Sequence, residues 1–220
     1  MEKNALVIGT SGGIGLALAQ ELEARGYSVT RLSRSKDGFD VTCEDSVATT
    51  LGRLETPFDL ILVASGILSN GQGPEKTLRS LSAKEMSDLF AVNAIGPALV
   101  LKHSVKLLHK RRKSVFVALS ARVGSIGENK LGGWFSYRTS KSALNQVLRT
   151  AAIELARTHK YLVCAAVHPG TVATEFTKNY PNHQSVSPHQ AAVHILNTLD
   201  NLTPEDSGHF FDWAGKPIPW

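Results

Sequence analysis

Short apolar runs alternate with longer segments of helical periodicity along the whole chain. Ala5-Leu6-Val7-Ile8 is uninterrupted, and residues 114–120 are built around a second such run, Val-Phe-Val-Ala-Leu. Runs this short and this apolar indicate strands that are buried on both faces of a sheet. The predicted strands cover residues 5–8, 28–33, 59–64, 114–120, 161–167 and 209–212, with a brief further strand ending at 40–42.

The segments between these runs have apolar residues three or four positions apart, which is typical of helices with one buried face. Two of them begin with capping signals, since Ser82 is followed by Glu85, and Ser187 by Pro188 and Gln190. The predicted helices cover residues 14–25, 45–54, 82–90, 93–112, 136–158 and 187–201.

This alternation continues without a repeat or a break in composition. It predicts a single α/β domain over residues 1–220: a Rossmann-type, doubly wound parallel sheet of about seven strands with helices on both faces. Ligands of such folds bind beyond the carboxyl ends of the strands, where the irregular segments 65–81, 121–135 and 171–186 are expected. The segment at about 171–186 is expected to close a substrate pocket.

A glycine-rich loop, Gly-Thr-Ser-Gly-Gly-Ile-Gly, joins the first predicted strand to the first predicted helix. Its glycines allow a tight turn at Gly9, close approach of a pyrophosphate at Gly13, and close packing of helix on strand at Gly15. The helix N-terminus supplies unpaired N–H groups and the positive end of a dipole. We therefore expect a dinucleotide here, held by Gly9, Ser11, Gly12, Gly13, Ile14 and Gly15.

The spacing Gly-x-x-x-Gly-x-Gly resembles that of the short-chain dehydrogenase/reductase family, and the resemblance extends over the whole chain. Further motifs follow in the family's order: Ala64-Ser65-Gly66 in altered form, Asn93, Tyr137-x-x-x-Lys141, and Pro169-Gly170 with Thr174. The tracts at 120–126 and 131–134 are more particular, and resemble the C-factor-like and sniffer-type carbonyl reductases.

Tyr137 and Lys141 lie four residues apart on a predicted helix, so their side chains share one face. A tyrosine is a poor base at neutral pH, but a nearby ammonium lowers the pKa of the phenol. Tyr137 can then exchange a proton with a carbonyl or alcohol oxygen, and the resemblance implies that Lys141 also binds the nicotinamide ribose. An ordinary amphipathic helix is the competing interpretation.

Asn93 precedes Pro97, which cannot donate a helical hydrogen bond, so a bend is expected there. The resemblance implies that Asn93 supports a proton relay with the lysine, whereas local sequence equally fits an asparagine that caps a helix. The family's catalytic serine position is Ala121 in this chain. Ser120 is our candidate for the third catalytic residue, with Ser125, or no serine at all, as the alternatives.

The second predicted strand ends at Ser33-Arg34, without the acidic residue that usually accepts the ribose hydroxyls of NAD. A guanidinium at Arg34 can pair with a 2′-phosphate, so NADP(H) is preferred and NAD(H) stays possible. Arg31 is a second candidate for binding the 2′-phosphate. Asp37 is the alternative candidate for an acid that binds the ribose, although it lies in a turn after the strand. The resemblance implies further cofactor contacts from Asp40, Val41, Ala64, Ser65, Gly66, Asn93, Tyr137, Lys141, Pro169, Gly170, Val172 and Thr174.

Composition excludes several classes of protein. Of 220 residues, 42% are hydrophobic and 20% are charged, which is typical of a soluble domain and not of a disordered chain. Cys43 and Cys164 are too few for a disulfide framework; they can pair, or more simply stay reduced. Without a long apolar run we expect no membrane span and a cytoplasmic location. The eight histidines form no ligand cluster, so no metal is expected.

The net charge is +5, and the one dense basic cluster is at 110–113. This cluster fits either a nucleic-acid patch or a solvated helix end, and we prefer the latter, with no nucleic acid as partner. The resemblance implies a homodimer or homotetramer joined through helices 93–112 and 136–158. The closing residues 215–220 are expected to dock on a neighbouring subunit or on their own pocket.

The sequence thus predicts an NADPH-dependent oxidoreductase that interconverts a carbonyl compound and an alcohol. A cofactor-binding signalling or regulatory protein with little turnover is the alternative, because Ala121 cannot donate a hydrogen bond. Aromatic residues of the loops either line an apolar substrate pocket or only pack there: Trp134, Phe135, Phe176 and Tyr180.

Overall fold

Six parallel strands form one sheet with the order β2-β1-β3-β4-β5-β6 in the computed structural model, which describes residues 3–71, 73–178 and 184–220. The chain runs from β1 outward to β2 and then crosses to β3 on the other side of β1, so the strand order reverses there. The strands are β1 Lys3–Ile8, β2 Tyr27–Leu32, β3 Leu60–Val63, β4 Ser114–Leu119, β5 Leu162–His168 and β6 Phe210–Asp212.

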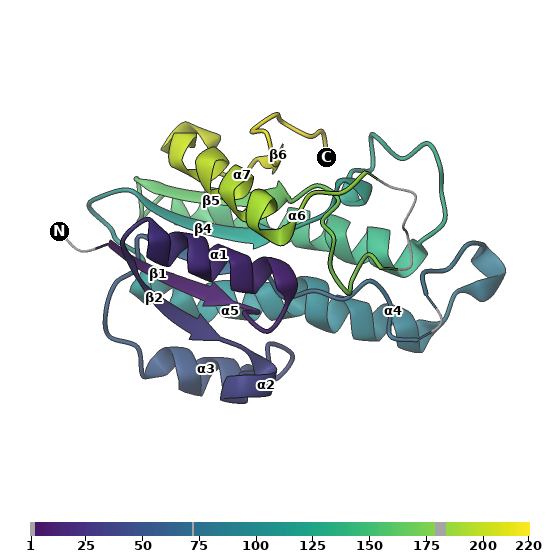
Figure 1. Ribbon diagram of the computed structural model, residues 1–220, viewed down its shortest axis with the longest axis horizontal. Helices are drawn as coiled ribbons and strands as arrows, with labels where there is room; N and C mark the ends of the chain where they lie inside the picture. Colours follow the sequence, from purple (N-terminus) through teal and green to yellow (C-terminus); the bar gives the residue numbers. More distant parts are fainter. Residues whose placement is uncertain (1–2, 72, 179–183) are drawn as a thin grey trace.

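Helices cover both faces of the sheet, as Figure 1 shows. They are α1 Gly13–Ala24, α2 Arg34–Asp37, α3 Glu44–Gly52, α4 Ala83–Phe90, α5 Gly96–Ser104, α6 Phe135–Leu155 and α7 Pro188–Asn201. Alternate residues of each strand point to opposite faces. Leu6 and Ile8 of β1 pack in one core cluster with residues of α3, α5 and α6, whereas Ala5 and Val7 pack in the other with α1 and α7. The Rossmann-type arrangement with two buried faces is confirmed.

The brief strand predicted to end at 40–42 is wrong, and the described sheet has six strands instead of about seven. Asp40 and Thr42 explain the difference. The Asp40 carboxylate accepts hydrogen bonds from the Thr42 N–H at 2.9 Å and from its hydroxyl at 2.7 Å. A carboxylate that bonds to the backbone two residues on closes a local turn, which competes with strand pairing.

The helix predicted over 93–112 is also shorter and less regular than expected. A π-helical turn spans Ala91–Ile95, α5 ends at Ser104, and a 3₁₀ turn over Val105–Leu107 follows. The basic cluster at 110–113 therefore lies in the turn before β4 and not at a helix end. The predicted capping at Ser187 is confirmed, since its hydroxyl accepts from the Gln190 N–H and the Gln190 side chain accepts from the Ser187 N–H.

The glycine loop can close because Gly15 has no side chain. A Cβ at Gly15 would lie 2.3 Å from the Gly9 carbonyl oxygen, which is backbone and cannot move away. By contrast, a Cβ at Gly52 of α3 would meet nothing within 4 Å.

We expect Gly15→Ala to lower the free energy of unfolding by about 1–3 kcal/mol, the usual cost of forced overpacking. The control Gly52→Ala should raise it by up to about 1 kcal/mol, because alanine loses less backbone entropy in a helix. Urea unfolding of both variants measures the difference. Equal stabilities would contradict the role assigned to Gly15.

Candidate active site

Tyr137 and Lys141 lie one turn apart in the first half of α6, and both are buried, with exposed fractions of 6% and 3%. The Lys141 ammonium donates to the Leu119 carbonyl at 2.9 Å, at the carboxyl end of β4. It also lies over the Tyr137 ring, 5.9 Å from the centroid. The four-residue spacing thus brings the two side chains together as expected.

Burial controls the ionisation of both groups. It lowers the pKa of Lys141 to about 8 and raises the pKa of Tyr137 above its ordinary value near 10. The direction for Tyr137 is opposite to the expectation that the ammonium favours the phenolate. The phenol lies in an apolar environment, and the ammonium is already bound to the Leu119 carbonyl oxygen. At neutral pH, Tyr137 is therefore protonated and able to donate.

Asn93 ties the loop after β3 to α6. Its amide nitrogen donates to the Ile67 carbonyl at 2.9 Å and to the Ser140 hydroxyl at 3.0 Å, and its amide oxygen accepts from the Ile67 N–H at 2.9 Å. The residue is fully buried in the π-helical turn and does not cap a helix. A Cβ at Gly66 would lie 3.3 Å from the Asn93 amide oxygen and 3.5 Å from the Lys141 nitrogen, so both groups meet at Gly66.

The serines considered for the third role use their hydroxyls elsewhere. Ser120 donates to the Asn145 amide oxygen at 2.7 Å, within the packing of β4 on α6. Ser125 donates to the Pro219 carbonyl. The residue that packs beside Tyr137 is Ala121, in a small apolar cluster with Leu89. Ala121 thus shares a small apolar cluster with Tyr137, whereas the hydroxyls of Ser120 and Ser125 donate to Asn145 and Pro219.

Aromatic and aliphatic side chains surround Tyr137. The rings of Trp134 and Phe176 lie 6.2 Å and 6.1 Å from its ring, centroid to centroid. Ile67, Leu68 and Val123 are partly buried against the same cluster. Tyr180 lies outside the described residues. The environment of the phenol is thus apolar on several sides.

The glycine loop leaves the N-terminus of α1 open to an anion. Its N-cap is Gly12, no side chain caps it, and its first turn holds no acidic residue. Thr174 lies against the loop, since a Cβ at Gly13 would be 2.8 Å from its methyl carbon. The Ser65 hydroxyl, from the loop after β3, is buried and has no hydrogen-bond partner among the described residues.

Comparison with known proteins identifies the family of the chain. A family model described as enoyl-(acyl carrier protein) reductase matches residues 8–212. The chain belongs to the short-chain dehydrogenase/reductase family. The resemblance drawn from the motifs is thereby confirmed.

Two curated relatives and one solved structure place the chain within the family. It is 30% identical to 1-hydroxy-2-glutathionyl-2-methyl-3-butene dehydrogenase of Rhodococcus sp. (strain AD45), with 98% of both chains covered. It is also 30% identical to the C-signal of Myxococcus xanthus over 74% of this chain and 93% of that protein. The NADPH-bound carbonyl reductase from chicken fatty liver matches with a TM-score of 0.85 and 25% identity, covering 100% of this chain and 94% of that one.

In this family member, the end of β2 leaves one arginine unpaired. Arg31 forms an ion pair with Glu23 at 2.7 Å, which turns it toward α1. Asp37 accepts from the Ser33 N–H at 2.7 Å and from its hydroxyl at 3.0 Å. The exposed Arg34 has no ion-pair partner within the described ranges 3–71, 73–178 and 184–220. Arg34, whose charge also helps to lower the pKa of Asp40, is therefore a cation available to a ligand beside β2.

Asp40 and Val41 follow on the same side of the site. Hydrogen bonds from Thr42 lower the pKa of Asp40, so its carboxylate stays ionised. Val41 is buried against the start of α5, where a Cβ at Gly96 would lie 2.9 Å from a Val41 methyl carbon.

A charged group at the ends of β4, β5 and β6 was not predicted. Arg122 binds Glu128 through two hydrogen bonds of 2.6 Å and 2.8 Å, and lies 3.7 Å from Asp212. His168 stands in register with Asp212, immediately before Pro169. His168 and Asp212 end their strands, and this position was the one signal available in the sequence.

The last residues of the chain pack on their own subunit, close to this group. The Gly127 N–H donates to the Trp220 carbonyl at 2.9 Å, and the Trp220 ring stacks on Phe210 with centroids 6.0 Å apart. Residues 215–220 thus contact their own chain through Gly127 and Phe210. The turn after β4 is thus held in place by the C-terminal segment.

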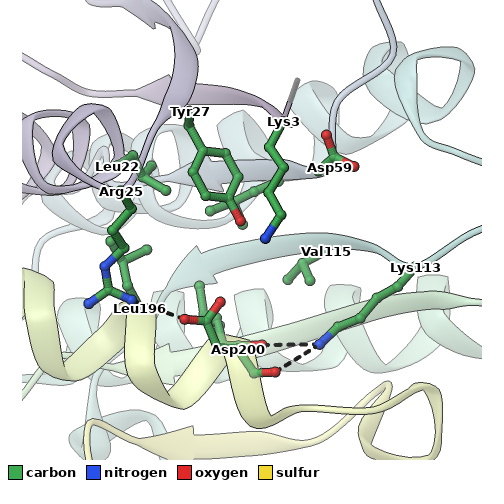
Figure 2. Close-up of a pocket in the computed structure, with 11 residues that line it drawn as sticks. Lys3, Leu22, Arg25, Tyr27, Asp59, Lys113, Val115, Leu196 and Asp200 are labelled. Atoms are coloured by element: carbon green, nitrogen blue, oxygen red, sulfur yellow. Dashed lines mark hydrogen bonds and ion pairs between the residues drawn. The ribbon is translucent and has the colours of Figure 1, made fainter. Parts of the chain in front are cut away.

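A pocket of about 280 Å³ lies where the strands begin, at the end of the sheet opposite to Tyr137 and the glycine loop (Figure 2). Its polar groups bind one another: Arg25 pairs with Asp200 at 3.0 Å, and Lys113 donates to the Leu199 and Asp200 carbonyls. This pocket is separate from the residues around Tyr137.

Over the described ranges, no helix combines the length and the apolar character that crossing a membrane requires. The same part of the chain holds no group of three or more His, Cys, Asp or Glu side chains that could ligate a metal ion.

His168 generates a prediction about stability. Burial, and then the nearby Arg122, lowers the pKa of His168 from 6.5 to about 4, and its Nδ1 has no partner among the described residues. Between these two pH values the unfolded chain binds a proton that the folded chain does not. Stability therefore falls as the pH drops from about 6.5 to 4, by about 3 kcal/mol for this group.

Urea unfolding at several pH values, for the natural protein and for His168→Gln, checks this prediction. The variant should lose less stability on acidification than the natural protein does. Parallel pH dependences in the two proteins would show that His168 is not responsible.

Proposed function

We propose that this protein is an NADPH-dependent oxidoreductase that interconverts a carbonyl compound and an alcohol, with Tyr137 as the proton donor and acceptor. The observation that carries the proposal is the buried phenol of Tyr137 next to Lys141, whose ammonium meets the Asn93 amide at Gly66. The NADPH-bound carbonyl reductase and the dehydrogenase found among its similar proteins support this reaction class.

The residues present fit a nicotinamide dinucleotide. The uncapped N-terminus of α1 suits the phosphates, and the unpartnered Ser65 hydroxyl is free to bind a polar group of the cofactor. When bound, the cofactor supplies or accepts the hydride. The residues proposed to hold it are Gly9, Ser11, Gly12, Gly13, Ile14, Gly15, Arg34, Asp40, Val41, Ala64, Ser65, Gly66, Asn93, Tyr137, Lys141, Pro169, Gly170, Val172 and Thr174.

NADP(H) is preferred over NAD(H) because of the charges at the end of β2. Arg34 is exposed and without an ion-pair partner, whereas Arg31 is paired with Glu23. A guanidinium binds a phosphate through two parallel hydrogen bonds, which makes Arg34 a suitable partner for a 2′-phosphate.

In carbonyl reduction, the Tyr137 phenol would give its proton to the carbonyl oxygen of the substrate, to which the bound cofactor would supply the hydride. Lys141, with a pKa of about 8, keeps its proton at pH 7 and stabilises the negative charge left on Tyr137. Asn93 binds the Ile67 backbone and the Ser140 hydroxyl, and so fixes the loop after β3 against α6.

Ala121 removes a hydrogen-bond donor from the substrate oxygen. The loss of one such donor costs about 10²–10³ in rate, so catalysis rests more heavily on Tyr137 here. The surrounding Trp134, Phe176 and Val123 favour a substrate with an apolar or aromatic group next to its carbonyl.

A signalling or regulatory protein that binds NADP(H) with little turnover is the second candidate. Ala121 favours it, as does the similarity to the C-signal of Myxococcus xanthus. The side chains of Tyr137 and Lys141 favour the enzyme, because cofactor binding alone does not need a buried proton donor.

We also propose a cytoplasmic homodimer or homotetramer. Two free cysteines, one of them exposed, suit a reducing compartment. Ile95 and Ile153 are half exposed on the π-helical turn before α5 and on α6, so both segments through which the resemblance implies association carry an exposed apolar side chain.

The first test measures NADPH binding by fluorescence titration, followed by NADPH oxidation with a panel of aldehydes, ketones and quinones. Tyr137→Phe should reduce turnover by at least about 10²-fold, because it removes the proton donor. Tight binding without turnover on any panel member would favour the regulatory candidate. In that case Ala121→Ser, which restores the missing donor, should raise the rate toward that of an enzyme.

Arg34→Ala tests the choice of cofactor. It should weaken NADPH binding by about 10- to 100-fold, the usual effect of losing charged hydrogen bonds, and leave NADH binding nearly unchanged. Arg31→Ala is the matched control, since this arginine is bound to Glu23. Equal loss in the two variants would contradict a specific contact between Arg34 and the 2′-phosphate.

A further inference from the structure

A buried carboxylate from a distant loop lies at the start of the helix that carries Tyr137. Glu75 belongs to the segment after β3 and has an exposed fraction of 7%. Its two carboxylate oxygens accept from the Ser136 N–H at 3.2 Å and 3.3 Å, and the Ser136 hydroxyl donates to one of them as well. Ser136 is the residue directly before Tyr137.

The first turn of α6 has no cap of its own. The N-cap position is Trp134, whose side chain makes no capping hydrogen bond. Its φ of 53° is the one left-handed conformation among the described non-glycine residues. A bulky residue in this region costs about 1–3 kcal/mol unless the surroundings hold it.

Glu75 supplies what the helix lacks. Its carboxylate satisfies the N–H of Ser136, and its backbone carbonyl accepts a hydrogen bond from the Trp134 N–H. One residue therefore holds both the strained N-cap and the first turn. A negative charge at a helix N-terminus is also favoured by the helix dipole.

The two residues that Glu75 holds both adjoin the phenol. Ser136 precedes Tyr137 in the chain, and the Trp134 ring meets the Tyr137 ring edge-on at 6.2 Å. One turn later, Asn93 binds Ser140, whose hydroxyl donates to the Tyr137 carbonyl at 2.9 Å. The loop after β3 is thus joined to α6 at two points, one on each side of Tyr137. Glu75 binds Ser136 directly, and Asn93 connects Ile67 to Ser140.

We propose that Glu75 is a positioning residue for the reaction: it fixes the first turn of α6 and so the place of the Tyr137 phenol. This inference rests on the proposed function. Glu75 acts through Ser136 and Trp134, and no contact between its carboxylate and substrate is invoked. A carboxylate suits the position better than an amide, because its two oxygens face only donors.

The test compares Glu75→Ala, Glu75→Gln and the natural protein, with Glu154→Ala as control, since Glu154 is an exposed carboxylate on the same helix. Glu75→Ala should lower kcat by about 10- to 100-fold, because a displacement of about 1 Å at the reacting group has this effect. KM and the Kd for NADPH should stay within about threefold. The kcat of Glu75→Gln should lie between those of Glu75→Ala and the natural protein, because one acceptor oxygen remains.

Hydrogen exchange of the amides at 135–138 provides a readout that does not depend on turnover. Exchange should be faster in Glu75→Ala and unchanged in Glu154→Ala. If Glu75→Ala does not fold, Ser136→Ala, which removes one donor to the carboxylate and leaves the charge in place, should give a kcat loss smaller than that of Glu75→Gln.

Unchanged kcat in both Glu75 variants would overturn the proposal. Parallel losses of kcat and NADPH affinity would also overturn it, because they would indicate a general distortion of the domain. The rate of the natural protein reports on the proposed function separately. If that protein turns over no carbonyl, the oxidoreductase proposal fails, and hydrogen exchange alone still shows whether Glu75 holds the first turn of α6.

Discussion

The arrangement of the site depends on one buried amide. Asn93 binds both backbone groups of Ile67 and the hydroxyl of Ser140, with no exposure to solvent. These hydrogen bonds connect three segments that are far apart in the chain: the loop after β3, the π-helical turn, and α6. An unpaired amide at this depth would cost about 1–3 kcal/mol, so the three segments are stable only in mutual register. The wide turn at 91–95 is what turns Asn93 toward its partners.

The fold could be predicted because its signals are local. Apolar runs such as 5–8 and 114–120 have few alternatives to a buried strand, and the glycine loop marks the first crossover. The strand predicted to end at 40–42 and the helix predicted over 93–112 were wrong, because a polar side chain or a proline ring alters the backbone there. Asp40 closes a turn with Thr42 through its carboxylate, and the segment around Pro97 adopts a π-helical turn before α5. Neither effect changes the hydrophobic pattern from which the elements were predicted.

The site could be predicted only in part, for the same reason. Tyr137 and Lys141 are brought together by helical spacing alone, which a sequence reveals. The engagement of Ser120 with Asn145, and of Ser136 with Glu75, depends on how α6 packs on β4 and on the loop after β3. Tyr137 shows most clearly what the sequence does not reveal. The four-residue spacing predicts that Lys141 is its neighbour, but burial in the fold determines that its pKa is raised.

The two cysteines differ in exposure, so one of them can be labelled selectively. Cys164 is buried in β5, and burial raises the pKa of its thiol to about 12, so it stays protonated and unreactive. Cys43 is exposed at the start of α3, just after the turn at Asp40 and Val41. A thiol-directed dye added to the natural sequence will therefore attach at Cys43, beside Asp40 and Val41 of the proposed cofactor site. Occupancy of that part of the site can then be followed optically without introducing a cysteine.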